Sequence, residues 1–399
     1  MIVSALSLTD FRNYASAEVE LVAGPNLFVG SNGQGKTNLV ESLGYLSTLG
    51  SHRVSTEQAM IRQGADAAVI RARLRHDGRE LLLEVQLNRA GANRAMLNRN
   101  EIKVRELPRY VSTVLFAPED LALVRGEPAG RRRFLDELLV LRTPRISGVI
   151  ADYERVLRQR NSLLKSARAS GVREGQLGTL EVWDERLVAL GSELIEARGR
   201  LVDELRPEVS AAYIAVAGDD HRAALASRLS ILGGDPDADG DSSVATGGAL
   251  SPAGVDGAGI DATEAAVRFR ESLDRLRRSE LDRGVTLVGP HRDDLLLELN
   301  GMPARGYASH GESWSFALAL KLASAAVLRR ESTAGDPVLI LDDVFAELDE
   351  SRRTRLAEAV ADFEQVLITA AVFGDVPERL AHHTVRIEAG RIVGGEEDR

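Results

Sequence analysis

The chain has 399 residues, more than one compact domain usually holds, so two domains or a head with an appendage are expected. It contains no cysteine, which excludes disulfides, thiolate metal sites and cysteine nucleophiles. The net charge of −10 does not exclude a basic surface, because seven acidic and no basic residues lie between Arg228 and Arg268. The N-terminus lacks the apolar core of a signal peptide and no apolar run could span a bilayer, so a cytoplasmic chain without membrane contact is expected.

The N-terminal part of the chain predicts strands around one helix. Residues 1–29 indicate a β-hairpin followed by a short strand, and residues 37–49 carry apolar side chains at helical spacing. Further strands are expected at 68–74, 80–87 and 111–116, the first two joined by the turn HDGR.

The middle of the chain changes to a helical pattern. From about Arg131 to residue 205, long charged and amphipathic segments predict a helical hairpin or short arm. Residues 231–262 are rich in Gly, Ala, Asp and Ser and cannot bury enough apolar surface to offset ordering, so they are expected to be a disordered loop. A helix at 263–281 and strands at 285–288 and 294–298 follow. The apolar runs 338–341 and 366–368 are typical of strands buried on both faces of a parallel sheet.

A phosphate-binding loop is the strongest motif. Residues 30–37 fit the pattern G-x-x-x-x-G-K-[ST], between an expected strand and an expected helix. Glycines let successive backbone N–H groups point at phosphate oxygens, and the helix adds its positive N-terminal end. Lys36 is expected to reach the β- and γ-phosphates, and Thr37 to hold Mg²⁺. The whole loop is expected to bind ATP: Gly30, Ser31, Asn32, Gly33, Gln34, Gly35, Lys36 and Thr37.

Two adjacent carboxylates form the second motif. Asp342 and Asp343 follow the apolar run 338–341. In a phosphate-loop enzyme the first acid after such a strand holds the metal, and a second acid can orient and deprotonate the attacking water. Asp342 is therefore the expected metal-side carboxylate, and Asp343 and Lys36 are the expected catalytic residues.

The distance between these motifs predicts the domain organisation. About 300 residues separate them, far more than in small phosphate-loop kinases and GTPases. The expected fold is therefore α/β, with a phosphate-loop ATPase head built from both chain ends around an inserted α-helical arm. The expected domains are 1–140 (head, N-terminal part), 141–280 (arm, with the loop 231–262) and 281–399 (head, C-terminal part).

Eight blocks in one order resemble the RecF family, bacterial recombination mediators with an ABC-type ATPase head related to the SMC proteins. The resemblance covers nearly the whole chain except residues 231–262. The blocks are FRNY at 11–14, GSNGQGKTNLVES at 30–42, SHR at 51–53, FAPEDLALVRGEP at 116–128, RRRFLDE at 131–137, YERVLRQRN at 153–161, GPHRDDL at 289–295 and LILDDVFAELD at 339–349.

The resemblance implies further site residues. Ser309 to Glu312 take the place of the ABC signature S-G-G-Q, so Ser309 and Gly311 are expected to bind the nucleotide of a second subunit. His310 and Glu312 depart from that pattern, and a negative Glu312 near triphosphate is unfavourable unless it points away. Asp349 ends the segment expected to be the D-loop at the dimer interface. Where ABC transporters carry a switch histidine this chain has Thr369, the candidate γ-phosphate sensor there.

The resemblance also implies a function. It implies an ATP-dependent homodimer with slow, weak ATPase activity, Mg²⁺ as cofactor, and binding to single-stranded and gapped duplex DNA. It further implies that RecO and RecR are partners in loading recombinase. The alternatives are the ATP-binding subunit of a transporter and a non-catalytic SMC-like linker. The helical arm and Thr369 speak against the first, and the short helical stretch speaks against the second.

Two charged segments are further candidates for DNA contact. Arg125, Arg131, Arg132, Arg133 and Arg142 form a dense cationic cluster, although charge runs are usually solvated faces. In the turn 289–294, His291 and Arg292 could contact DNA or nucleotide, or belong to a plain surface hairpin. Aromatic residues are 4% of the chain, so base-specific stacking is not expected.

Overall fold

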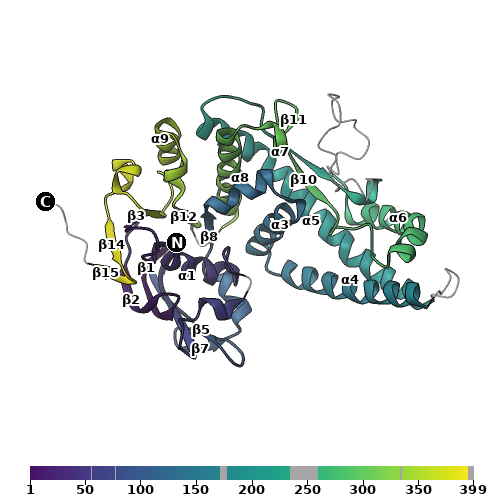
Figure 1. Cartoon of the computed structure of the whole chain (residues 1–399), viewed down its shortest axis with the longest axis horizontal. Helices are drawn as coiled ribbons and strands as arrows, with labels where there is room; N and C mark the ends of the chain where they lie inside the picture. Colours follow the sequence, from purple (N-terminus) through teal and green to yellow (C-terminus); the bar gives the residue numbers. More distant parts are fainter. Residues whose placement is uncertain (55, 77, 171–177, 234–258, 333–334, 394–399) are drawn as a thin grey trace. The chain divides into compact units, whose positions relative to one another are not determined.

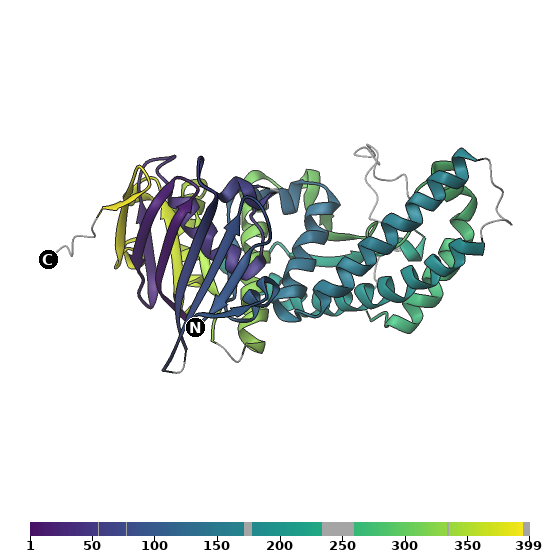
Figure 2. The same cartoon turned by 90° about the horizontal axis from the view of Figure 1, so that it is seen from below.

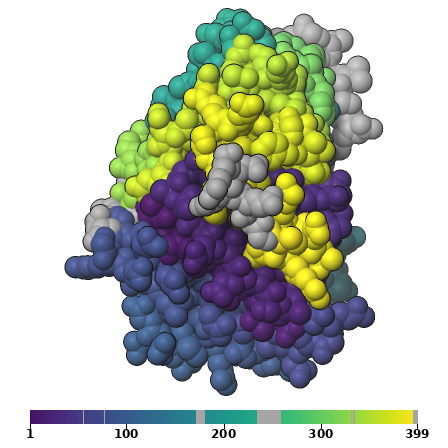
Figure 3. All heavy atoms as spheres, turned by 90° about the vertical axis from the view of Figure 1, so that its left-hand side faces the viewer, coloured from purple at the N-terminus to yellow at the C-terminus, as the bar shows by residue number. Residues whose placement is uncertain are grey.

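The computed structural model describes residues 1–393 apart from 55, 77, 171–177, 234–258 and 333–334. The chain divides into two compact units. Unit 1 comprises residues 1–121, 211–220 and 314–399, and unit 2 comprises residues 122–210 and 221–313. Unit 1 therefore takes its residues from both chain ends, and its purple N-terminal and yellow C-terminal surfaces adjoin in Figure 3. The expected domain boundaries at 140 and 280 differ from these limits and stay a prediction.

Unit 1 contains a six-stranded, mostly parallel sheet that joins distant parts of the sequence. Its order is β15-β14-β3-β13-β12-β8, and only β15 is antiparallel to its neighbour. Every residue of β12 and β13 is buried, as expected for apolar runs covered on both faces. The strands are β3 (Gly24–Val29), β8 (Thr113–Phe116), β12 (Val338–Asp342), β13 (Gln365–Ala370), β14 (Thr384–Glu388) and β15 (Arg391–Val393).

A second, antiparallel sheet of six strands completes the core of unit 1 (Figure 2). Its order is β2-β1-β4-β5-β6-β7. The apolar core joins side chains of both sheets and of α1 (Lys36–Thr48). The strands are β1 (Ile2–Phe11), β2 (Tyr14–Glu20), β4 (Ala67–His76), β5 (Arg79–Asn88), β6 (Arg94–Leu97) and β7 (Asn100–Ile102). The expected N-terminal hairpin and the strand pair β4–β5 are confirmed.

Short helices complete unit 1. The 3₁₀-helix η1 (Glu57–Met60) precedes β4, and η2 (Val104–Arg109) follows β7. The helix α9 (Glu350–Ala359) follows β12, and α8 (His310–Glu331) begins in unit 2 and continues in unit 1.

Unit 2 is mainly helical, as expected from the change of period near Arg131 (Figure 1). A three-stranded sheet of order β11-β10-β9 accompanies the helices. The elements are α2 (Leu121–Arg125), α3 (Pro128–Arg142), α4 (Ile146–Ala169), α5 (Gly178–Ala217), β9 (Ala224–Arg228), α6 (Ala262–Arg283), β10 (Asp294–Leu299), β11 (Met302–Pro303) and α7 (Ala304–Tyr307). No helix among the described residues is long and apolar enough to cross a membrane.

Two sequence-based expectations need correction in unit 2. Residues 285–288 are not a strand: the backbone N–H groups of Thr286 and Leu287 donate to the side chains of Asn161 and Glu280, each at 2.8 Å, instead of to a neighbouring strand. Most of the loop expected at 231–262 lies outside the described residues. Its described ends are ordered, because Ile231 is buried and Asp261 caps α6.

A buried ion-pair network joins three helices of unit 2. The fully buried Arg160 of α4 donates to Asp184 of α5 at 2.7 Å and to Glu280 of α6 at 2.6 Å. Its third nitrogen donates to the Thr286 hydroxyl at 2.8 Å. Arg277 pairs with the second oxygen of Asp184 at 2.7 Å. Because buried charges are tolerated only when paired, these contacts fix the relative positions of α4, α5 and α6.

Replacing Arg160 with methionine should lower the free energy of unfolding by about 3–5 kcal/mol, because Glu280 would keep a buried charge without its cation. Urea denaturation followed by circular dichroism measures the change. The control is Arg270→Met, since Arg270 is exposed and its pair with Glu185 should contribute less than about 1 kcal/mol. Equal changes in the two variants would contradict a structural role for the network.

Candidate functional site

Residues 30–37 form a tight turn between β3 and α1, as the motif predicts. Gly33 and Gly35 have φ angles of 81° and 119°, in the left-handed region that favours glycine. A Cβ at Gly35 would lie 2.8–2.9 Å from the side chains of Asn13 and Tyr14. A Cβ at Gly30 would lie 2.3 Å from the Ile387 carbonyl oxygen. The glycines are therefore required both by the backbone and by the segments packed against it.

Segments from both chain ends hold this turn in place. The Tyr14 hydroxyl donates to the Gly35 carbonyl, and Asn13 Nδ2 donates to the Gln34 carbonyl, each at 3.0 Å. From the β14–β15 hairpin, the Gly390 N–H donates to the Gln34 carbonyl at 2.9 Å and the Ala389 N–H bonds to Gln34 Oε1. The loop is thus preorganised by four contacts from outside its own sequence.

Lys36 points into the site, where it is enclosed by protein. Its side chain is 3% exposed, and Nζ donates to the Ser31 carbonyl at 3.4 Å. Nζ also lies 3.9 Å from Asp343 Oδ1. The ammonium group therefore has weak protein partners and remains available to a stronger anion.

Asp342 connects the phosphate loop to the central sheet. Its Oδ1 accepts hydrogen bonds from Thr37 Oγ1 at 2.9 Å and from Thr369 Oγ1 at 2.6 Å. Burial raises the pKa of Asp342 and the neighbouring Asp343 adds to that shift, while the two threonine hydroxyls act in the opposite direction. Because Thr37 commits its proton to Asp342, its lone pairs are left for a cation.

Asp343 follows in a left-handed conformation, with φ 51°. Its N–H donates to Thr369 Oγ1 at 2.9 Å. Its Oδ1 is shielded from solvent and accepts no hydrogen bond from the described residues, although the side chain as a whole is 30% exposed. Such an oxygen is suited to accept a proton from a group that enters the site.

The donor set fits Mg²⁺. A threonine hydroxyl and a carboxylate are the hard oxygen ligands that Mg²⁺ prefers, and it usually keeps water and phosphate oxygens as its remaining ligands. Among the described residues no group of three acidic or histidine side chains forms a metal cage. Thr37 and Asp342 are the residues that would hold the ion.

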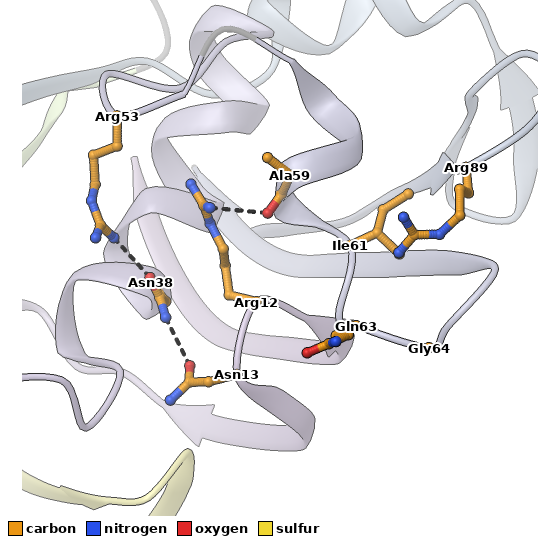
Figure 4. A pocket seen from close by; sticks show the side chains of 9 residues that line it. All are labelled: Arg12, Asn13, Asn38, Arg53, Ala59, Ile61, Gln63, Gly64 and Arg89. Carbon is orange, nitrogen blue, oxygen red and sulfur yellow. Dashed lines mark hydrogen bonds between the residues drawn. The ribbon is translucent and has the colours of Figure 1, made fainter.

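An open pocket of about 530 Å³ lies in unit 1 beside the loop (Figure 4). Its lining includes three arginines and no carboxylate. Arg53 donates to Asn38 at 2.9 Å and Asn38 to Asn13 at 2.8 Å, so hydrogen bonds lead from the pocket to the residue that holds Gln34 (Figure 4). The lining residues are Arg12, Asn13, Asn38, Arg53, Ala59, Ile61, Gln63, Gly64 and Arg89.

Sequence reasoning did not find this pocket. The parts of the sequence that could have indicated the pocket are the blocks FRNY and SHR, which supply Arg12, Asn13 and Arg53. Glu41 of α1 organises both blocks, because its carboxylate accepts a bidentate hydrogen bond from Arg12 and another from Ser51. Ser51 Oγ in turn accepts the N–H of Arg53 at 3.0 Å.

The segment 309–312 caps the start of α8. The Ser309 N–H donates to Glu312 Oε2 at 2.7 Å and the Glu312 N–H donates to Ser309 Oγ at 3.2 Å, a reciprocal capping box at the start of α8. Glu312 also lies 3.5 Å from His221 Nδ1. The Glu312 carboxylate, which would be unfavourable near triphosphate, is thus turned back onto its own helix. That Ser309 and Gly311 bind a second copy's nucleotide stays a prediction.

Asp349 caps α9 by accepting the Arg352 N–H at 2.9 Å. This backbone hydrogen bond, followed by the charge of Arg352, lowers the pKa of Asp349. Its expected place at a dimer interface stays a prediction.

Four of the five arginines in the cluster near residue 131 make hydrogen bonds within unit 2, and contact of the cluster with DNA stays a prediction. Arg131 is buried and donates to both oxygens of Asp294, at 2.8 and 2.9 Å. Arg132 donates to the Asp293 carbonyl at 2.7 Å, Arg125 to Ser313 at 3.1 Å and Arg142 to Glu204 at 2.9 Å. These four side chains make contacts within unit 2, and among the five Arg125 and Arg133 are exposed.

In the turn 289–294, His291 and Arg292 are half-buried, and their contact with DNA or nucleotide stays a prediction. His291 Nδ1 lies 2.7 Å from the Tyr153 hydroxyl, and burial lowers the pKa of His291 to about 3. Arg292 donates to the Thr286 carbonyl at 3.2 Å. Burial raises the pKa of Asp293 to about 6. The turn is packed into unit 2 by these side chains.

Exposed cations without a counter-ion gather instead at one edge of the antiparallel sheet of unit 1. Five basic side chains of the segment from β6 to η2 are exposed and form no ion pair or side-chain hydrogen bond with the described residues. Arg94 and Lys103 flank the last recorded pair of β6 and β7, Ala95–Ile102. We call this set the basic edge: Arg94, Arg99, Lys103, Arg105 and Arg109.

Comparisons with known proteins agree with the fold and the phosphate loop. The model of the family "RecF/RecN/SMC N terminal domain" matches residues 2–387. The DNA replication and repair protein RecF of Clavibacter sepedonicus is 66% identical over 394 residues, which cover 98% of this chain and 95% of the relative. That of Leifsonia xyli subsp. xyli is 67% identical over 393 residues, which cover 98% and 99%.

Solved structures show the same fold. The recombination mediator protein RecF-ATP in the RecFOR pathway has a TM-score of 0.79 at 26% identity, over 98% of each chain. An Smc head bound to the C-winged helix domain of ScpA has a TM-score of 0.54 at 14% identity, covers 100% of this chain and 98% of its own, and shows the fold alone. The expected ABC-type ATPase head, in its RecF- and SMC-like form, is therefore confirmed, and the chain belongs to the RecF family of DNA replication and repair proteins.

Proposed function

We propose that this chain is an ATP-dependent DNA-binding protein of recombinational repair. It binds ATP and Mg²⁺, forms a homodimer with the nucleotide between its subunits, and hydrolyses ATP slowly. The dimer binds gapped duplex DNA and, with RecO and RecR, assists the loading of recombinase. The observation that carries the proposal is the convergence of Lys36, Thr37, Asp342 and Asp343 from opposite chain ends on one preorganised loop.

The residues divide the work of ATP hydrolysis. Backbone N–H groups of the loop and the N-terminal end of α1 receive the phosphates, and the compact ammonium of Lys36 adds its charge there. When bound, Mg²⁺ would neutralise charge on the phosphate oxygens. Asp343 Oδ1, which accepts no hydrogen bond from the described residues, orients a water molecule and takes its proton. Thr369 holds Asp342 and the backbone of Asp343 in place.

The arginine-lined pocket receives the remainder of the nucleotide. Its hydrogen-bonded chain from Arg53 through Asn38 to Asn13 begins in the pocket and ends at the phosphate loop. Arg53 and Arg89 donate to neutral oxygens in the described residues, so their charges are not cancelled there by a carboxylate. An open, cationic pocket next to a phosphate loop suits the polar ribose and the α-phosphate.

The basic edge supplies contacts to DNA phosphates. Cations held by a carboxylate bind a second anion poorly, which makes Arg131 and Arg142 weak candidates for DNA contact. The basic edge has no such partner in the described part of the chain, and its segment 94–109 carries two acids, Glu101 and Glu106, against five basic residues. Charges at an edge strand can also serve to prevent aggregation of sheets. The salt dependence of DNA binding distinguishes this protective role from contact with DNA phosphates.

Lys36→Ala should abolish ATP-dependent dimerisation, because the β- and γ-phosphates lose their main side-chain partner. Light scattering with ATP and Mg²⁺ measures the mass. Lys165→Ala is the matched control, since Lys165 is exposed on α4 of unit 2. A Lys36→Ala protein that still dimerises with ATP would count against the phosphate site.

Asp343→Asn should retain ATP binding but slow hydrolysis by about 10²–10⁴-fold, the usual contribution of a general base. The variant should accumulate as an ATP-bound dimer. Asp342→Asn should instead weaken Mg²⁺-nucleotide binding and give fewer dimers. Phosphate release and light scattering distinguish the two variants, and identical behaviour would refute the division of labour.

Replacing Lys103, Arg105 and Arg109 together with glutamine should weaken binding to gapped duplex DNA and reduce its salt dependence. Each lost phosphate contact lowers the slope of log K against log salt by about 0.9. A fluorescence anisotropy titration at several salt concentrations gives the slope.

The matched control replaces Arg158, Arg200 and Arg268 with glutamine. It makes the same change in net charge, but these arginines pair with glutamates on their own helices. Equal slopes for the two triple variants would show that net charge alone acts and that the basic edge is not the contact surface.

A further inference from the structure

Thr369 is a buried polar residue that follows the apolar run 366–368 of β13. The strand reads Gln-Val-Leu-Ile-Thr-Ala, and all six residues are buried. A fully buried strand position needs only a β-branched shape, which valine provides without a polar atom. The hydroxyl of Thr369, whose residue is 0% exposed, must therefore be satisfied by specific partners.

Those partners are the two carboxylate residues of the site. Thr369 lies beside Asp342 in the parallel register of β12 and β13. Its hydroxyl donates to Asp342 Oδ1 at 2.6 Å and accepts the N–H of Asp343 at 2.9 Å. The Thr369 hydroxyl thus donates its proton to the side chain of Asp342 and accepts a hydrogen bond from the backbone N–H of Asp343.

Each of these two hydrogen bonds has a distinct physical role. Asp342 is a buried carboxylate next to another carboxylate, so its charged and oriented form needs hydrogen-bond donors. Thr37 provides one donor at 2.9 Å, but Thr37 is also the expected ligand of the metal and cannot fix Asp342 independently of it. Thr369 provides the second donor from the rigid centre of the sheet.

The backbone contact concerns Asp343. Its left-handed conformation, φ 51°, is uncommon for a residue other than glycine and needs support from its surroundings. The hydrogen bond from its N–H to Thr369 Oγ1 anchors the residue at the point where the chain leaves β12. The direction of the Asp343 carboxylate follows from that anchored backbone.

We propose that Thr369 is a positioning residue that sets Asp342 for Mg²⁺ and Asp343 for the attacking water, without itself touching the nucleotide. This inference rests on the proposed nucleotide site and deepens it. It replaces the expectation that Thr369 senses the γ-phosphate, because both hydrogen-bonding directions of its hydroxyl are already used by the two aspartates.

The test compares Thr369→Val, which keeps the shape and removes the hydroxyl, with Thr369→Ser, which keeps the hydroxyl. Binding of a fluorescent ATP analogue is titrated with Mg²⁺, and binding in EDTA is measured separately. Loss of a residue that orients a metal ligand typically weakens metal affinity about 10–100-fold, so the Mg²⁺ midpoint of Thr369→Val should rise by at least about tenfold. Binding in EDTA should be unchanged, and Thr369→Ser should stay within about threefold of the parent chain.

The matched control is Thr113→Val. Thr113 is equally buried in β8 of the same sheet, and its hydroxyl bonds to Ser47 Oγ, away from the carboxylates. It pairs with Val338, at the opposite end of β12 from Asp342. Thr113→Val should therefore destabilise the sheet to a comparable extent in thermal unfolding while leaving the Mg²⁺ midpoint unchanged.

Three outcomes would overturn the inference: an unchanged midpoint in Thr369→Val, an equal rise in Thr113→Val, or a Thr369→Ser variant as impaired as Thr369→Val. If Thr369→Val does not fold, Thr369→Ala and Thr369→Ser carry the same comparison, since only the latter restores the hydroxyl. A parent chain that fails to bind the analogue at all would refute the proposed function, which is a separate result.

Discussion

The hydrogen bond between Thr37 and Asp342 joins residues 305 positions apart, and the whole candidate site depends on it. It forms because β13 pairs in parallel with both β3 and β12, which brings the carboxyl ends of these strands to one edge of the sheet. In open α/β sheets this edge is where ligands bind. The phosphate loop follows β3, the two aspartates end β12 and Thr369 lies near the end of β13, so one pairing pattern assembles every chemical group of the site.

Arginine has two different roles in this chain. In unit 2, Arg131 and Arg160 are buried and their guanidinium groups are fully committed to carboxylates and other oxygens. In unit 1, the basic edge and Arg53 carry charge that no carboxylate of the described residues neutralises. Local sequence does not separate these roles, since a run such as Arg131-Arg132-Arg133 appears more basic than the edge. Asp294, the acidic partner of the buried Arg131, lies far away in the chain.

The short-range sequence pattern was sufficient to predict the phosphate loop and most of the helices and strands. The glycines at 33 and 35 are required by their own backbone conformation, and the apolar run before Asp342 is long enough to predict a buried strand. The strand expected at 285–288 was wrong, because Asn161 and Glu280 supply acceptors that no local pattern contains. The contact between His291 and Tyr153 was missed for the same reason, since Tyr153 belongs to α4, far away in the sequence.

Residue identity and spacing therefore specify the family, the loop that receives the triphosphate, and the carboxylates that follow β12. These depend on covalent neighbours and on the period of the strand or helix. Tertiary structure decides which hydroxyl groups donate hydrogen bonds to Asp342 and which arginines have no carboxylate partner. It also decides that Glu312 turns onto its own helix. Each of these outcomes depends on a partner distant in sequence or on burial, and both arise only when the strands and helices pack together.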